Sequence, residues 1–174
     1  MWIMKYIAAL RSDRRGVAAI EFAIFASLIS IGMLNVVDIA VYVYQRMQVE
    51  YATQAGAQAA WQTCDINHLP ALNNCSGLST AVTRAVQGTS LGTHVTLQSG
   101  SPSEGYYCVN GSGTLQYMAD VNNKPTDCSA AGSAGVSPAD YITISTTFAY
   151  APLFPGITVA STFTTPIKIG RAHV

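Results

Sequence analysis

Hydrophobic and polar positions divide the chain into a long apolar segment near its start and an alternating pattern towards its end. Sixteen consecutive residues, Phe22–Val37, carry no charge. With its flanks, this apolar character runs over 28 residues from Val17 to Tyr44, interrupted only by Glu21 and Asp38. Because roughly 20 apolar helical residues cross a bilayer core of about 30 Å, the pattern predicts a helix long enough to span a membrane.

The same helix is expected to continue well beyond the apolar segment. No proline occurs between Val17 and Gln62, so we predict one uninterrupted helix over that range. Small residues recur four positions apart in its first half, at Ala19, Ala23 and Ser27, and such rows allow helices to approach closely in apolar surroundings. From Gln45 the helix becomes amphipathic, and its alanine side is expected to pack on a sheet.

The remainder of the chain has the pattern of a small α+β head. We predict a loop over Cys64–Ser76, a short helix over Leu78–Gln87 capped by Ser76 or Ser79, and a long irregular loop over residues 120–139. Alternation then predicts strands at His94–Gln98, Tyr106–Val109, Thr114–Met118, Asp140–Tyr150 and Ile157–Ile169. Asn110–Gly113 joins two of them as a hairpin, and Pro166 pushes the last strand to an edge or a bulge. The expected fold is α+β, a long N-terminal helix packed on a small antiparallel β-sheet.

Charge is low but unevenly distributed. Only 10% of residues are charged and the formal net charge is zero. Residues 1–16 carry a net +3, whereas residues 17–174 carry a net −3. The positive end is expected to stay in the cytoplasm while the rest crosses the membrane. No basic patch occurs in the remainder, which argues against nucleic-acid binding.

Four cysteines, Cys64, Cys75, Cys108 and Cys128, all follow the apolar segment. An even count in an exported domain suggests disulfides, for which three connectivities are possible. We favour Cys64–Cys75 and Cys108–Cys128 because neighbours in sequence close short loops; free buried thiols are the alternative. The spacings lack paired C-x-x-C knuckles, so no zinc site is expected.

Motifs of catalysis and nucleotide binding were searched for without result. The sequence contains no P-loop, no G-x-G-x-x-G that opens a helix, no H-E-x-x-H and no G-x-S-x-G. Asp120, Asp127 and Asp140 lack the tight spacing of calcium loops. We therefore expect neither an enzyme nor a bound cofactor or metal.

Glu21 is the anomaly of the apolar segment, because a carboxylate inside an apolar helix costs about 2.5–3.5 kcal/mol even on lenient insertion scales. The residues around it, Arg14-Arg15-Gly16-Val17-Ala18-Ala19-Ile20-Glu21-Phe22, resemble a class of type IV prepilin cleavage sites. The wider stretch, roughly residues 12–62, resembles the TadE-like family of minor pilins (pseudopilins) of tight-adherence (Flp) pili. Asp38 lies where that family often has a second acid. The simpler alternative is that the Glu21 side chain merely extends to the edge of the membrane.

The resemblance implies a division of the chain and a route through the cell. A prepilin peptidase would cut after Gly16, so that residues 1–16 form a leader and Val17 becomes the N-terminus. Residues 17–44 would form the transmembrane and filament-core half of a type IV pilin-like helix. Residues 45–174 would form a periplasmic, later extracellular, head. The expected partners are the prepilin peptidase, other pilin subunits with their assembly machinery, and the inner membrane before assembly.

Two classes of function are consistent with the sequence. In the first, Glu21 pairs with the N-terminal amine of a neighbouring subunit, and the protein initiates or caps a pilus and supports surface adhesion. In the second, the chain is a permanently anchored periplasmic or surface binding module for glycans or a partner protein. The mature N-terminus discriminates them, since Val17 supports the pilin and Met1 the anchored module.

Overall fold

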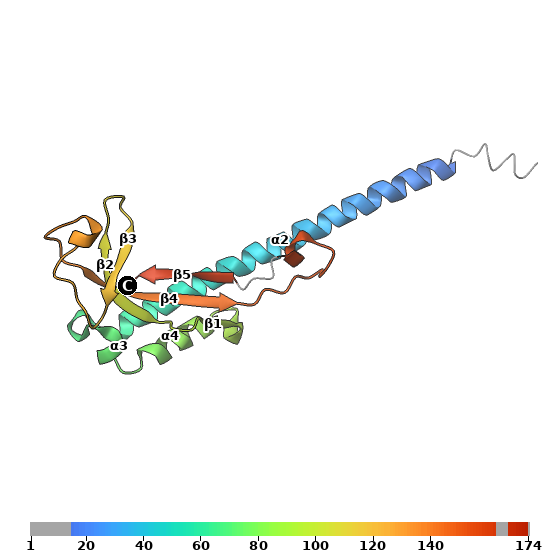
Figure 1. Cartoon of the computed structure of the whole chain (residues 1–174). Helices are drawn as coiled ribbons and strands as arrows, with labels where there is room; N and C mark the ends of the chain where they lie inside the picture. The colour runs from blue at the N-terminus through green and yellow to red at the C-terminus, as the bar shows by residue number, and fades with distance from the viewer. Residues whose placement is uncertain (1–14, 163–166, 174) are drawn as a thin grey trace, which may run out of the picture. The chain divides into compact units, whose positions relative to one another are not determined.

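A helix of 49 residues, α2 (Arg15–Thr63), begins the described part of the computed structural model, which covers residues 15–162 and 167–173 (Figure 1). Its bounds confirm the helix predicted between Val17 and Gln62. The other elements follow in this order: η1 (Ile66–His68), α3 (Ala71–Asn74), α4 (Leu78–Gln87), η2 (Gly92–His94), β1 (Val95–Leu97), β2 (Ser103–Val109), β3 (Leu115–Asp120), η3 (Ser129–Ala131), β4 (Ala139–Phe148), η4 (Val159–Thr162) and β5 (Ile167–His173).

The described residues fall into two compact units. The first unit contains α2 as far as Tyr42 together with residues 151–162. The second contains residues 43–150 and β5, and therefore includes the C-terminal part of α2 and all the strands. We call these the N-terminal unit and the head.

The head is built on a five-stranded sheet that is antiparallel throughout, which confirms the predicted α+β fold (Figure 1). Its central strand is β4, which pairs with β1 near Phe148, with β2 near its start, and with β5. β5 pairs with residues of β4 that also pair with β1 or with β2, so β5 must lie on the other side of β4 from both strands. β1 and β2 therefore lie one after the other along the same side of β4. β3 then pairs with β2.

The core of the head lies between α2, α4 and β4. Every second residue of β4 from Ile142 to Phe148 is buried, as the alternating pattern predicts. Leu78, Val82 and Val86 present one buried face of α4. The α2 positions that complete this core are mostly small and recur at helical spacing: Val49, Ala52, Thr53, Gly56 and Ala60. Small side chains let α2 lie close to both neighbours.

Gly56 marks the closest approach of α2 to its neighbours. A Cβ atom added there would lie 2.8 Å from Val86 Cγ2 and 3.6 Å from Ile144 Cγ2. Three residues away along the helix, Thr53 Oγ1 shares a 2.6 Å hydrogen bond with Thr146 Oγ1 of β4 in the buried core. The Thr53 hydroxyl also bonds its own helix at Val49 O, 2.9 Å away. Helix and sheet are thus joined by a tight contact and a buried polar bond.

The β2–β3 hairpin forms where the sequence predicted it. Asn110 Oδ1 accepts hydrogen bonds from the N–H groups of Ser112 and Thr114, both at 3.0 Å, and Gly113 adopts a positive φ of 77°. An asparagine that bonds its own turn and a glycine with positive φ are the residue types such a turn needs.

Three local expectations are wrong. The predicted cap of α4 at Ser76 or Ser79 is replaced by Gly77, which has a φ of 92° and no side chain to bond. The Cys64–Ser76 loop contains two short helices, η1 and α3.

The third error concerns the last predicted strand, which does not begin at Ile157. Residues 159–162 form the 3-10 helix η4, and strand geometry starts at Ile167. The physical reason is that Thr158 and Val159 bond side chains of α2 instead of a neighbouring strand. Pro166, expected to push the last strand to an edge or a bulge, lies outside the described residues.

Candidate functional site

The residues implicated in processing and assembly lie together on the first turns of α2. No heavy atom lies within 4 Å of a Cβ built on Gly16. Val17 is 57% exposed, and the side chain of Glu21 is exposed as well. Among the residues that the structure describes, no hydrogen bond or ion pair to Glu21 is found. The acid is therefore accessible on a helix surface that is otherwise apolar.

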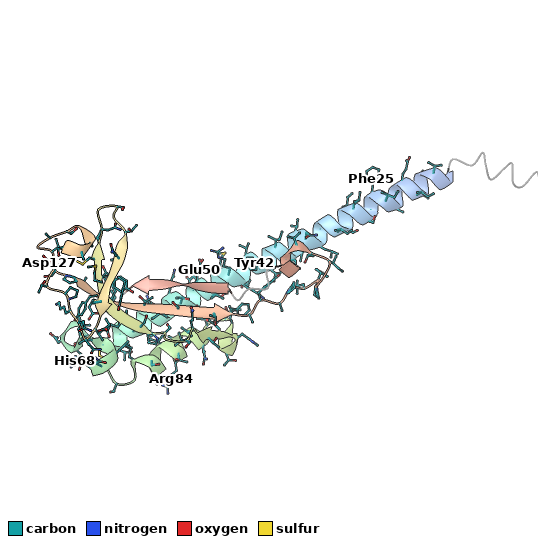
Figure 2. The ribbon with its side chains drawn as sticks, in the orientation of Figure 1. Phe25, Tyr42, Glu50, His68, Arg84 and Asp127 are labelled. Carbon is teal, nitrogen blue, oxygen red and sulfur yellow. A yellow bond between two sulfur atoms is a disulfide. The ribbon has the colours of Figure 1, made fainter. Side chains whose placement is uncertain are left out.

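The surface around Glu21 remains apolar along the N-terminal unit. Phe22 is 74% exposed and Val36 is 68% exposed, although both are large hydrophobic residues. Phe25, which is labelled in Figure 2, is 64% exposed. By length and composition α2 contains a segment able to cross a membrane, and none of that segment is buried within the protein. An uncovered apolar surface of this extent marks contact with lipid or with other helices.

Two serines in this segment are hydrogen-bonded within their own helix. Ser27 Oγ donates to Ile24 O at 2.8 Å, and Ser30 Oγ donates to Ala26 O at 2.7 Å. In an apolar environment every polar group needs such an internal partner. The two serines are therefore small side chains on this surface whose hydroxyls are already hydrogen-bonded.

Asp38 has a different role from Glu21, because it is completely buried within the N-terminal unit. Its Oδ1 accepts from the Leu153 N–H at 2.8 Å, and its Oδ2 accepts from the Thr158 hydroxyl. The sequence pattern marked Asp38 as an acid that interrupts the apolar segment, and the family resemblance marked it as a second acid, but neither predicted its two partners. The available signal was a second acid in an apolar helix, which requires a nearby donor.

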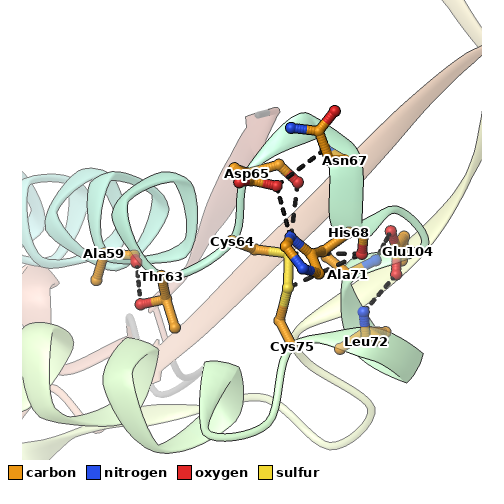
Figure 3. The surroundings of a disulfide bond; sticks show 10 residues. All are labelled: Ala59, Thr63, Cys64, Asp65, Asn67, His68, Ala71, Leu72, Cys75 and Glu104. Atoms are coloured by element: carbon orange, nitrogen blue, oxygen red, sulfur yellow. Dashed lines mark hydrogen bonds and ion pairs between the residues drawn. A yellow bond between two sulfur atoms is a disulfide. The ribbon is translucent and has the colours of Figure 1, made fainter.

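Two disulfides join the cysteine pairs that the sequence favoured, Cys64–Cys75 and Cys108–Cys128, with a Cα–Cα distance of 5.7 Å in each. Cys108 and Cys128 lie in a small buried cluster with Ala131. The first disulfide ties the end of α2 to the segment after α3 (Figure 3).

Glu104 connects this first disulfide region to the sheet. Its two carboxylate oxygens accept from the Ala71 N–H at 2.6 Å and from the Leu72 N–H at 2.7 Å, at the start of α3 (Figure 3). Nearby, His68 Nδ1 lies 2.6 Å from Asp65 Oδ1. This hydrogen bond and one from the Asn67 N–H lower the pKa of Asp65.

A pocket of about 480 Å³ opens beside these residues in the head. Its walls are mainly apolar, with three acids and no basic side chain; they comprise Ala60, Trp61, Cys64, Asp65, Leu69, Ala71, Glu104, Asp140 and Ile142. Burial, and then the negative charge of Glu104, raise the pKa of Asp140 to about 6, although Lys124 opposes this. Asp140 Oδ1 is buried and has no hydrogen-bond partner within the described part of the chain.

A metal site is not found in the described residues, where no group of three or more histidine, cysteine, aspartate or glutamate side chains gathers. Asp127, one of the acids weighed for calcium, is already engaged: its oxygens accept from the Ser129 N–H at 3.0 Å and the Gly135 N–H at 3.1 Å. These bonds stabilise the loop that carries Cys128.

The geometry defines a class of protein: an α+β head on a helix whose N-terminal segment is apolar enough to enter a membrane. Comparison with known families is more specific. Residues 16–58 match the family described as TadE-like protein, which confirms the family resemblance over that segment and associates it with Tad pilus systems. Comparison with curated proteins and with solved structures gave no match.

Proposed function

We propose that the protein is a minor pilin (pseudopilin) of a tight-adherence (Flp) type IV pilus, with residues 1–16 as a leader that a prepilin peptidase removes after Gly16. The observation that carries the proposal is the exposed acid Glu21 on an uncovered apolar helix, within the segment matched to the TadE-like family. Residues 17–44 then enter the membrane and later the filament core, and residues 45–174 form the periplasmic, later extracellular, region that contains the head.

Glu21 gives this assembly a driving force and a register. Alone in lipid it is costly, whereas a neighbour's Val17 amine at 4 Å attracts it by about 4 kcal/mol at an effective dielectric of 20. The contact runs from one subunit to the next and is not self-complementary, and contacts of this kind build open helical filaments when the rotation between subunits does not close a ring. A head of this size is consistent with a subunit that initiates or caps the pilus and takes part in adhesion.

Two measurements in the native host test the proposal. Mass spectrometry of the protein from cells should find Val17 as the mature N-terminus, and an intact Met1 would contradict the proposal. The Glu21→Ala variant should be cleaved normally but enter pili at a reduced level. Glu50→Ala is the matched control, because Glu50 is also an exposed acid of α2 but is paired with Arg46 at 3.7 Å. Equal incorporation of both variants would reject the Glu21 pairing.

The pocket beside Trp61 supports a second candidate function, a membrane-anchored module that binds a partner protein or a glycan. Apolar pockets of this size with a few converging polar groups are frequent ligand sites. Trp61 is 71% exposed, so its fluorescence can report on an occupant. In a Trp2→Phe background, titration with purified pilus proteins or with glycans should shift the Trp61 emission if the head binds them. An unchanged emission with every such partner would reject this function.

A further inference from the structure

Residues 151–162 form an apolar surface beside the N-terminal part of α2, and these residues belong to the same compact unit (Figure 1). The segment contains no charged residue. Leu153, Ile157 and Val159 are 55%, 58% and 60% exposed, although all three are large hydrophobic residues. Side chains of this kind turned outwards need an apolar partner.

Two N–H groups and one hydroxyl of this segment donate hydrogen bonds to side chains of α2. Asp38 accepts hydrogen bonds from the Leu153 N–H and the Thr158 hydroxyl. Asn35 Oδ1 accepts from the Val159 N–H at 2.9 Å, while its Nδ2 donates to Ile31 O at 2.8 Å. These three donors face α2 while large apolar side chains of the segment are exposed. Because irregular backbone does not face lipid inside the hydrocarbon region, such a segment is suited to the membrane boundary, where its apolar side chains can reach the acyl chains.

The position of these contacts along α2 fits the edge of a bilayer. At 1.5 Å per residue, Asn35 and Asp38 lie about 27 and 32 Å along the helix axis from Val17. The hydrocarbon core of a bilayer is about 30 Å thick. With Val17 at the inner boundary, the segment lies at the outer boundary, and Tyr42 and Tyr44 follow where interfacial aromatic residues are expected.

We propose that residues 151–162 dock into the outer leaflet of the membrane, with Leu153, Ile157 and Val159 among the upper acyl chains. This proposal rests on the membrane placement of α2 given above. Lipid is favoured over a protein partner because large apolar residues of α2 in the same compact unit, such as Val36, are exposed as well, and the segment has no charge to specify a partner. The same arrangement shields the Asp38 carboxylate from lipid.

Fluorescence quenching by brominated lipid tests this docking. The full chain, with Trp2→Phe and Trp61→Phe, is reconstituted in phosphatidylcholine vesicles whose acyl chains are brominated either near the headgroup or near the chain end. Ile157→Trp should be quenched several-fold by the first lipid and little by the second. Val109→Trp, at a head position that is 51% exposed, is the matched control and should be quenched by neither.

A third variant, Phe25→Trp, separates failure of the docking from failure of the membrane placement. Quenching of Phe25→Trp by deep bromine without quenching of Ile157→Trp would overturn the docking and leave the span intact. Absence of quenching in both would overturn the span and the docking together. A blue shift of Ile157→Trp without bromine quenching, present only at high protein-to-lipid ratio, would assign the surface to a second copy and overturn the lipid proposal.

The contacts to Asp38 provide a further readout. Asp38→Ala should release the segment and reduce quenching of Ile157→Trp at least two-fold, while quenching of Phe25→Trp stays unchanged. Asp38→Asn retains an acceptor for the Leu153 N–H and should restore part of the effect. Full quenching of Ile157→Trp in the alanine variant, with α2 helicity intact by circular dichroism, would show that Asp38 does not position the segment.

Discussion

The N-terminal and C-terminal parts of α2 belong to one helix, yet their side chains meet different surroundings. Up to Tyr42 the helix exposes large apolar residues such as Phe22 and Phe25 (Figure 2). From Val43 it buries small residues, including Ala52 and Gly56, against α4 and β4. Large exposed and small buried side chains reverse the usual rule of globular proteins. The first part is therefore suited to partners outside the chain, and the second to the fold of the head.

This comparison predicts that substitutions in the two parts have separate consequences. Changes in the head should alter its free energy of unfolding and leave membrane insertion intact. Changes in the N-terminal part should alter insertion or assembly and leave the unfolding of the head intact. The predictions below test this separation, and unfolding is followed by near-ultraviolet circular dichroism of the full chain in detergent micelles.

The largest effect is expected from loss of the buried disulfide. Cys108 and Cys128 are almost fully buried and separated by 20 residues in sequence. Replacing both by alanine should lower the free energy of unfolding of the head by about 3 kcal/mol, because a closed loop of this length restricts the unfolded chain. Urea unfolding measures the change. An unaltered midpoint would show that the head does not depend on this cross-link, and loss of membrane insertion would contradict the separation of the two parts.

Gly56→Ala is expected to have the next largest effect. Its Cβ would lie 2.8 Å from Val86 Cγ2, so side chains of the core must shift, at a cost of about 1–3 kcal/mol. The gain in helix propensity offsets about 1 kcal/mol, which leaves a net loss of up to about 2 kcal/mol. Thermal unfolding measures it.

Gly32→Ala is the matched control within the same helix, because no atom lies within 4 Å of the added Cβ. It should leave the unfolding of the head unchanged. Equal destabilisation by both substitutions would contradict the comparison between the two parts of α2.

The hydrogen bond between Thr53 and Thr146 provides a third test. Thr53→Val deprives the buried Thr146 hydroxyl of this partner and should destabilise the head by about 1–2 kcal/mol. The double variant with Thr146→Val should lose less than the sum of the single variants, and a double-mutant cycle of unfolding energies measures the coupling. Ser27→Ala, which removes a hydroxyl bonded to its own helix, should leave the head unaffected. Additive single effects would contradict a direct bond.

Local patterns predicted much of this fold because the responsible residues are close in sequence. An unbroken proline-free run predicted α2, and an Asn110-Gly111 turn predicted the β2–β3 hairpin. The segment after Ile157 was predicted wrongly as a strand, because its apolar and polar residues alternate. Its Thr158 hydroxyl instead donates a hydrogen bond to Asp38, 120 residues away in sequence, which no local pattern reveals. The pocket was missed for the same reason, since Glu104 and Asp140 come from different strands. Within the candidate site, Gly16, Val17 and Glu21 were identified from a local sequence motif. Their roles in processing and assembly remain predictions.

The smallest effect concerns pH and belongs to the head alone. Burial and the charge of Glu104 raise the pKa of Asp140 from 3.8 to about 6, so the folded state binds its proton more tightly than the unfolded state. The contribution of Asp140 to stability is therefore fully present below about pH 4 and is lost as pH rises through about 6. Because Asp140 is only partly buried, solvent screening limits the decline to less than about 1 kcal/mol. Urea unfolding of the wild-type chain between pH 4 and 7 measures it.

Asp140→Asn should remove this decline and raise stability at neutral pH. Asp127→Asn is the control, because hydrogen bonds from Ser129 and Gly135 lower the pKa of Asp127, so its titration falls below this pH window. Its substitution should therefore leave the slope between pH 4 and 7 unchanged. A slope that persists in Asp140→Asn would assign the pH dependence to other groups. A slope that instead disappears with Glu21→Ala would mean that the N-terminal part of α2 contributes to the stability of the head, contrary to the separation argued here.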